Sequence, residues 1–271
     1  MDEKVSEEWM LIKMYFQKYY LKILFTKKNI LIPIITLSMI TLSVFLLYSK
    51  LSFNDILIWE FFGQGNGDFV LMRFLTMLIY NSVPVYLLCI FIEKDCTERS
   101  MHLTIRLKSK KRWMKTILYS SILFVISYIL ISICITAITA FIFGMDFIGY
   151  NGFNDIFVIC SIKPVTPWFL YLVIVVGKSL ELLFCFFIIL LIYCYTRKVT
   201  IGFLILLMSY FLIFIPTEIV TYLPTGMSSL SRVLEFSGTG LSLWQVLAIL
   251  IIINGILYNY IRFISYKKIF D

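Results

Sequence analysis

The sequence predicts an all-α protein that crosses a membrane several times. Hydrophobic residues make up 61% of its 271 residues and charged residues 15%, whereas a soluble domain is about half apolar and a quarter charged. The mean hydropathy is +0.93. The apolar residues fall in runs of about 20, the length that a helix needs to cross the hydrocarbon core, whereas barrel strands would be shorter and would alternate. These observations exclude a soluble domain, a disordered chain and a fibrous repeat.

Six segments are long enough to span the membrane, and they form one transmembrane domain over residues 29–271. The fifth ends indistinctly, because Pro216 and Glu218 interrupt it. Nineteen of the 24 Lys and Arg lie in the N-terminal segment, the 93–115 loop, the loop after span four and the C-terminal end. Since Lys and Arg accumulate on the cytoplasmic side, we expect both termini in the cytoplasm. The expected spans are residues 30–48, 69–92, 116–143, 168–195, 200–219 and 243–265.

Residues 1–28 are expected to form an amphipathic helix that lies in the membrane interface. Charged residues such as Glu8 and Lys22 fall opposite an apolar stripe on a helical wheel. The stripe would sit at the acyl boundary, with lysines at anionic headgroups. Two interpretations stay open: a plain anchor beside the first span, or a helix that slides on the membrane and transmits force to it. The stripe consists of Trp9, Ile12, Phe16, Tyr19 and Ile23, with Tyr20 beside them.

The 93–115 loop is compatible with a helix of its own. Its acidic start and basic end both suit the helix dipole, and Thr97 can cap a helix that starts near Glu98. Met101 and Ile105 offer small apolar contacts. The basic residues either only hold the topology or belong to a docking helix for a cytoplasmic partner.

Glu93 at the end of span two is followed by a polar turn and then by Ser109-Lys110-Lys111-Arg112-Trp113, with Lys115 opening span three. This order resembles the permeases of ABC-2 type transporters, in which an acidic residue, a coupling helix and a Ser/Arg/Lys-rich turn stand in the same places. The amphipathic N-terminal helix and six spans also fit that family. The resemblance implies that the coupling residues are Glu93, Asp95, Thr97, Met101, Ile105, Arg106, Ser109 and Arg112.

The resemblance also implies partners and a function. The chain would be a permease subunit in a bacterial cytoplasmic membrane, paired with an identical or sibling subunit and driven by a separate ATPase. ATP and Mg²⁺ would be bound by that ATPase, and no cofactor is expected in this chain. Exported substrates in such systems are peptides, lipids or drug-like amphiphiles, including antimicrobial peptides. The alternative is a free-standing membrane protein, either an immunity factor or a secondary carrier, without an ATPase.

Three features on the expected outer side carry less specific signals. The glycine-rich run 63–67 lies in the 49–68 loop and is expected to be a flexible turn, since no Walker A motif occurs in the chain. Residues 216–241 are either a re-entrant hairpin or a plain loop. Arg73 is expected to anchor span two at the outer interface.

Lys178 and Glu181 are the notable charges within a span. They are three residues apart and therefore share a helix face. Ionisable residues inside the membrane mark functional sites by default. We weigh a transport path or gate against a structural clasp, or a Lys178 that snorkels outward. No catalytic or metal site is expected, because His102 is the only histidine, and the net charge of +8 is explained by topology rather than by nucleic-acid binding.

Overall fold

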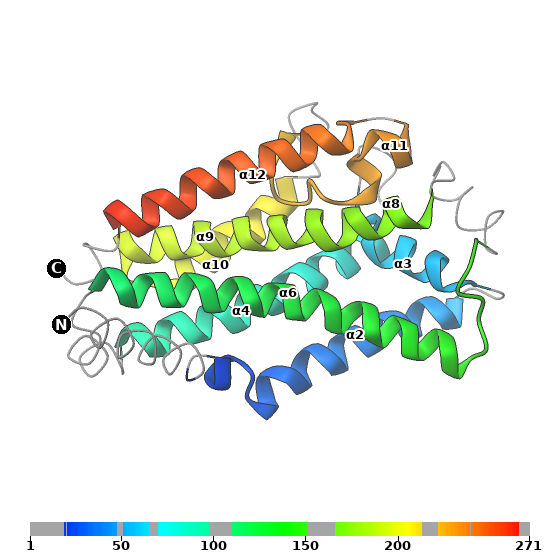
Figure 1. The fold of residues 1–271 in the computed structure, drawn as a ribbon, viewed down its shortest axis with the longest axis horizontal. Coiled ribbons are helices and arrows are strands. Elements are labelled where there is room, and N and C mark those ends of the chain that lie inside the picture. Colours follow the sequence, from blue (N-terminus) through cyan, green and yellow to red (C-terminus); the bar gives the residue numbers. More distant parts are fainter. Residues whose placement is uncertain are drawn as a thin grey trace, which may run out of the picture.

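The computed structural model describes residues 19, 21–47, 51–64, 70–97, 110–150, 166–212, 222–238 and 240–265. Every named element within these ranges is a helix (Figure 1). In chain order they are α2 (Lys27–Leu47), α3 (Phe53–Phe62), α4 (Leu71–Thr97), α6 (Lys110–Ile142), α8 (Pro167–Leu172), the π-helical turn η2 (Val173–Gly177), α9 (Lys178–Thr196), α10 (Val199–Phe211), the 3₁₀ turn η5 (Leu230–Arg232), α11 (Leu234–Ser237), α12 (Leu243–Tyr260) and the π-helical turn η6 (Ile261–Ser265).

Five of these helical stretches are long and apolar enough to cross a membrane: α2, α4, α6, the continuous run from α8 to α9, and α12 with the start of η6. They coincide with the first four and the last of the expected spans. The fifth expected span corresponds to α10, whose described part has 13 residues, fewer than a membrane crossing needs. The chain is therefore an all-helical, multi-pass membrane protein by length and composition.

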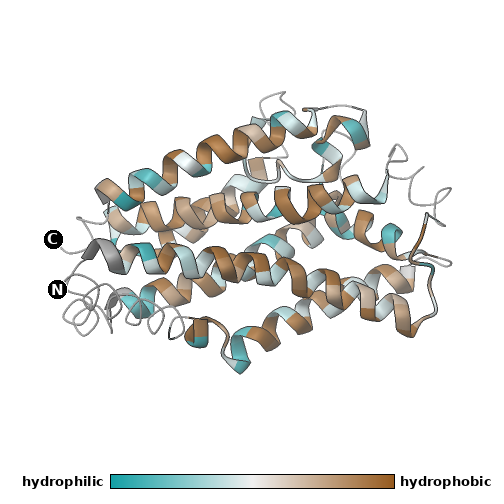
Figure 2. Ribbon diagram, viewed as in Figure 1, coloured by the Kyte–Doolittle hydropathy of each residue, from teal (hydrophilic) through white to brown (hydrophobic). Residues whose placement is uncertain are grey.

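Helix α9 lies at the centre of the bundle and packs against α4, α6, α10 and α12. In the most apolar stretch of the continuous run from α8 to α9, 72% of residues are buried, compared with 28% in the spans of α2 and of α12. Gly202 allows α10 to approach α9 closely, because a methyl group there would lie 3.2 Å from Ile189 Cα. The outer helices instead expose apolar side chains such as Leu46 and Phe141, as suits a surface that faces lipid. The long helices are mostly hydrophobic along their length (Figure 2).

Within the 49–68 segment, which the sequence predicted to be a loop, residues 53–62 form a helix. A capping box at Ser52 starts α3, and all ten residues of α3 are buried among the other helices. The backbone N–H of Phe53 donates to Asp146 O at 2.9 Å, and the Asn54 side chain donates to Gly149 O at 2.9 Å. A helix of ten residues is too short to cross a bilayer, so the length criterion for a membrane span does not detect α3.

Gly63 and Gln64, the described start of the glycine-rich run, are packed against other parts of the chain. Gly63 ends α3 with a φ of 66°, and a Cβ there would overlap the Ser229 side chain. Gln64 is buried as well, and its side chain accepts a hydrogen bond from Val70 N at 3.1 Å. Residues 65–67 lie outside the described part of the chain. Gly63 is therefore a point of close contact between two segments far apart in the sequence.

Arg73 does not lie on the surface as an interfacial anchor. Its side chain is buried, and its guanidinium lies 4.8 Å from the Phe62 ring centroid and 5.3 Å from that of Trp59. Such cation–π contacts are favourable where water is excluded. Arg73 therefore joins the first turn of α4 to α3.

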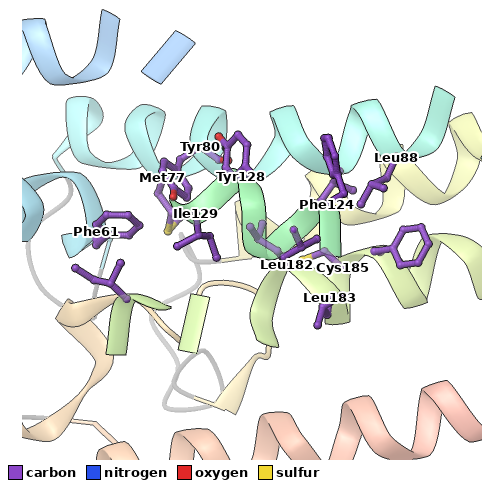
Figure 3. Packing of buried hydrophobic residues seen from close by; sticks show 14 of the residues in the cluster. Phe61, Met77, Tyr80, Leu88, Phe124, Tyr128, Ile129, Leu182, Leu183 and Cys185 are labelled. Atoms are coloured by element: carbon purple, nitrogen blue, oxygen red, sulfur yellow. Dashed lines mark hydrogen bonds between the residues drawn. The ribbon is translucent and has the colours of Figure 1, made fainter. Parts of the chain in front are cut away.

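A chain of aromatic contacts joins α3 to the centre of the bundle. The ring centroids of Phe61 and Tyr80 lie 4.9 Å apart, and those of Tyr80 and Tyr128 lie 5.3 Å apart, both in edge-on arrangements (Figure 3). The Tyr128 hydroxyl also donates to the Tyr80 carbonyl at 3.0 Å. Apolar burial gives little net gain when the alternative environment is lipid, so such specific contacts set the packing of helices in a membrane.

Little of the proposed interfacial helix is described. Residues 21–24 are helical, Tyr19 is exposed, and Ile23 is half-buried against the core. Trp9, Ile12 and Phe16 lie outside the described residues. The amphipathic helix over 1–28 stays a prediction.

Candidate functional site

The Glu181 carboxylate accepts hydrogen bonds from several separate parts of the chain. Glu181 lies in the first turn of α9 and is completely buried. Six donor atoms from five residues surround its two oxygens, three to each oxygen. The donors are Asn81 Nδ2, Tyr210 OH and Gly226 N at Oε1, and Lys178 Nζ, Ser228 N and Ser228 Oγ at Oε2.

These donors come from four separate parts of the chain. Asn81 on α4 donates over 2.9 Å, and Tyr210 on α10 donates over 3.3 Å. The backbone N–H groups of Gly226 and Ser228 donate over 2.9 and 3.2 Å. A single side chain on α9 therefore holds α4, α10 and the segment before α12 together.

Lys178 and Glu181 form the ion pair that their spacing predicts. Lys178 Nζ lies 3.2 Å from Glu181 Oε2, and both side chains are buried. Burial rules out a Lys178 that snorkels to the interface. Lys178 directly follows the π-helical turn η2, and such turns often occur at functional sites within α-helices.

Residues 222–238 pack against the helices. Residues 216–221 and 239 lie outside the described part of the chain, so the choice between a re-entrant hairpin and a loop over 216–241 stays open. Every residue from 225 to 233 is buried. The Arg232 guanidinium donates to the carbonyls of Thr225 at 3.1 Å and Gln64 at 3.4 Å. Figure 1 shows α11, which is part of this segment, at the same end of the bundle as α3 and away from the end where α4 finishes and α6 begins.

Arg232 contributes a second buried charge near Glu181. Burial lowers the pKa of its guanidinium to about 10, and the negative charge of Glu181 opposes that shift. Arg232 therefore stays protonated at neutral pH. Two cations, Lys178 and Arg232, thus accompany the Glu181 carboxylate.

The donor set holds Glu181 in its ionised form. A protonated acid would place its own hydrogen among groups that are already donors, whereas a carboxylate can accept all of them. Hydrogen bonds to an ionised acceptor are roughly twice as strong as neutral ones. The arrangement is a clasp that depends on charge, and its release would free the 222–238 segment from α9.

The expected coupling residues have different surroundings. Glu93 is exposed, but Asp95 is buried and its Oδ2 accepts a hydrogen bond from Trp113 Nε1 at 2.9 Å. Thr97 is the last residue of α4, which runs five residues beyond the predicted end of span two. Asp95 therefore joins α4 to α6.

The basic turn expected over 109–112 is helical from Lys110, because α6 begins there. Arg112 consequently lies within the first turn of α6. The remaining coupling residues lie outside the described part of the chain: Met101, Ile105, Arg106 and Ser109.

Sequence reasoning missed most partners of Glu181. Asn81 gave a usable signal, since an amide in the middle of an apolar span needs a polar partner. Gly226 and Ser228 gave none, because they act largely through backbone N–H groups and lie 45 and 47 residues from Glu181. Tyr210 resembles many other aromatic residues in apolar spans.

Within the described ranges no group of three or more His, Cys, Asp or Glu is placed to hold a metal ion. No protein-family model, curated protein or solved structure matches the chain. The case for a function therefore depends on the geometry and on the resemblance of the 93–115 segment.

Proposed function

We propose that this chain is the permease subunit of an ABC-2 type transporter in a bacterial cytoplasmic membrane, driven by a separate ATPase. The proposal is supported by the way helix α4 links residues 93–115, the segment that resembles the ABC-2 family, to the buried Glu181 site. Residues 98–109 join α4 and α6, whose ends are held together by the Asp95–Trp113 hydrogen bond. A force on this segment would therefore act on both helices together.

Helix α4 offers a direct mechanical path from that segment to Glu181. Asp95 lies near its end, and Asn81 lies fourteen residues earlier and donates to Glu181. A helix rises about 1.5 Å per residue, so the two points are about 21 Å apart along a helix that contains Pro84 between them. In the proposed mechanism, ATP-driven motion shifts α4, and the clasp has two packings that nucleotide states favour differently.

The finer topology belongs to this proposal. Six spans require α10 to extend into residues beyond Leu212, and the distribution of basic residues supports two cytoplasmic termini. Two such subunits and two ATPase subunits would form the transporter. Export of a peptide, lipid or drug-like amphiphile follows from the family resemblance alone.

The first test is purification of the chain from its native membrane in mild detergent. The expected result is a complex that contains a nucleotide-binding subunit and hydrolyses ATP. Failure of any ATPase to accompany the chain after crosslinking in intact membranes would favour the free-standing alternative.

A second test separates docking from folding. Glu93→Lys changes an exposed carboxylate, and we expect the complex to fold but to lose substrate stimulation of ATP hydrolysis. Lys94→Gln, at the exposed neighbouring position, is the matched control and should keep that stimulation. Asp95→Lys would replace the acceptor of the Trp113 hydrogen bond by a buried positive charge and break the α4–α6 contact. This variant therefore does not report on docking. Normal coupling in Glu93→Lys would contradict the docking role of Glu93.

A further inference from the structure

Another buried carboxyl, that of Glu60, lies apart from the Glu181 clasp. Glu60 is on α3, and 4% of its surface is exposed. Its Oε1 lies 2.6 Å from the hydroxyl of Thr41 on α2, and its Oε2 lies 3.1 Å from the hydroxyl of Thr136 on α6. Glu60 is therefore the polar contact that joins α3 to two spans at once.

The surroundings of Glu60 lack the positive charge that accompanies Glu181. Within the described part of the chain, its polar partners are the two threonine hydroxyls, and no Lys or Arg forms an ion pair with it. Removing an isolated carboxylate from water is so unfavourable that such a group takes up a proton instead. Two neutral donors do not offset that free energy.

The helical elements that pack most closely against α3 are α2, α4, α6 and η5. None of their charged side chains that the structure describes forms an ion pair with Glu60. Tyr80 on α4 and Tyr128 on α6 are near enough to interact electrostatically with Glu60, but both are neutral phenols. Among the charged residues of these elements, Arg73 lies over the rings of Trp59 and Phe62, and Arg232 donates to backbone carbonyls. The other charged residues stand at the far ends of α2, α4 and α6: Lys27, Lys28, Glu93, Lys94, Asp95, Lys110, Lys111, Arg112 and Lys115. Asp55, earlier on α3 itself, accepts from Ser52.

We propose that Glu60 binds a proton from solvent and that the neutral acid is the form that holds α3 between α2 and α6. In the neutral form, the acid proton and each of the two threonine hydroxyl protons have one acceptor. The acid donates from Oε1 to Thr41 Oγ1, and that hydroxyl donates to Leu37 O at 3.0 Å. The Thr136 hydroxyl donates to Oε2. A separation of 2.6 Å is normal for an O–H···O hydrogen bond.

Burial raises the pKa of the Glu60 carboxyl from 4.5 to about 7, and the two threonine hydroxyls oppose part of that shift. Glu60 therefore exchanges its proton within the physiological range. Release leaves an unpaired charge between α2, α3 and α6, which favours any arrangement that lets Glu60 reach water. Because α3 contacts η5, a movement of α3 would reach the segment that Glu181 holds. This inference does not depend on the proposed transport function.

Infrared difference spectroscopy of the purified protein between pH 5.5 and 8.5 tests the proposal. We expect the C=O band of a protonated carboxylic acid to disappear as the pH rises, with a midpoint near 7, and to be absent in Glu60→Gln. Thr136→Val keeps the acid but removes one hydrogen bond, so it should shift the frequency of the band. This second variant, with the wild type, keeps the test valid where Glu60→Gln folds poorly.

Two results would overturn the proposal. One is the absence of a protonated-acid band at pH 5.5, or a band that is unchanged by Glu60→Gln and Thr136→Val. The other is a wild-type thermal stability that rises with NaCl but not with matched choline chloride at pH 8.5, and loses that sodium dependence in Glu60→Gln. That result would assign the carboxylate to a bound sodium ion.

Discussion

Glu181 and Glu60 are buried to a similar degree in one bundle, yet their surroundings favour opposite charge states. Six donors, including an ammonium group, surround Glu181, whereas two threonine hydroxyls contact Glu60. Burial alone therefore does not decide whether a carboxyl is charged; the number and charge of its donors decide it. The Glu181 region is a charged clasp, and the Glu60 region is a neutral contact that a proton can switch.

The largest expected effect is the loss of Glu181. Glu181→Leu leaves the Lys178 ammonium buried without its partner, and we expect it to lower the free energy of unfolding by about 3–5 kcal/mol. Lys178→Met combined with Glu181→Leu removes that unpaired charge and should be less destabilising than Glu181→Leu alone. Denaturant titration of the single and double variants measures this coupling, and losses that add would contradict the ion pair as the centre of the clasp.

Replacing each glutamate by its neutral isostere sharpens the comparison. At pH 6, Glu181→Gln should lower the free energy of unfolding by about 3 kcal/mol, because the amide brings two N–H groups into a ring of donors. Glu60→Gln should change it by no more than about 1 kcal/mol, because the neutral amide resembles the neutral acid. Equal losses at both sites, measured by the same titration, would mean that the two carboxyls do not differ in charge.

The pH dependence of stability should differ in the same direction. The pKa of Glu60 is raised in the folded protein, so its contribution to stability is fully present below pH 4.5 and is lost as the pH rises to about 7. The wild type should therefore lose more Tm than Glu60→Gln between pH 5 and pH 8. Thermal unfolding of both proteins across this range checks the sign, and parallel curves would remove Glu60 as the titrating group.

The smallest effect is expected from the loss of one neutral donor to Glu181, the Tyr210 hydroxyl. Tyr210→Phe removes one hydroxyl, 3.3 Å from Glu181 Oε1, and leaves five donors in place. We expect a loss of about 1 kcal/mol, measured by denaturant titration. A loss as large as that of Glu181→Gln would show that Tyr210 holds α10 in place by itself.

The spans could be predicted from the sequence because their length and hydropathy are set by the bilayer. Helix α3 could not be recognised by that criterion, although Ser52-x-x-Asp55 before an apolar run is a helix-start signal. The Lys178–Glu181 pair followed from local spacing alone. The other hydrogen-bond donors to Glu181 come from distant segments of the chain. Asn81 lies 100 residues away, so the meeting of these groups depends on tertiary packing.

The charge difference between the two glutamates can be measured directly by solid-state NMR of the protein in lipid at pH 6, with ¹³C-labelled glutamate. Glu60→Gln and Glu181→Gln assign the two buried side-chain carboxyl signals. The predicted result is a Glu60 signal at the chemical shift of a carboxylic acid and a Glu181 signal at that of a carboxylate in the same sample. Two carboxylate signals, or a protonated Glu181, would contradict the account.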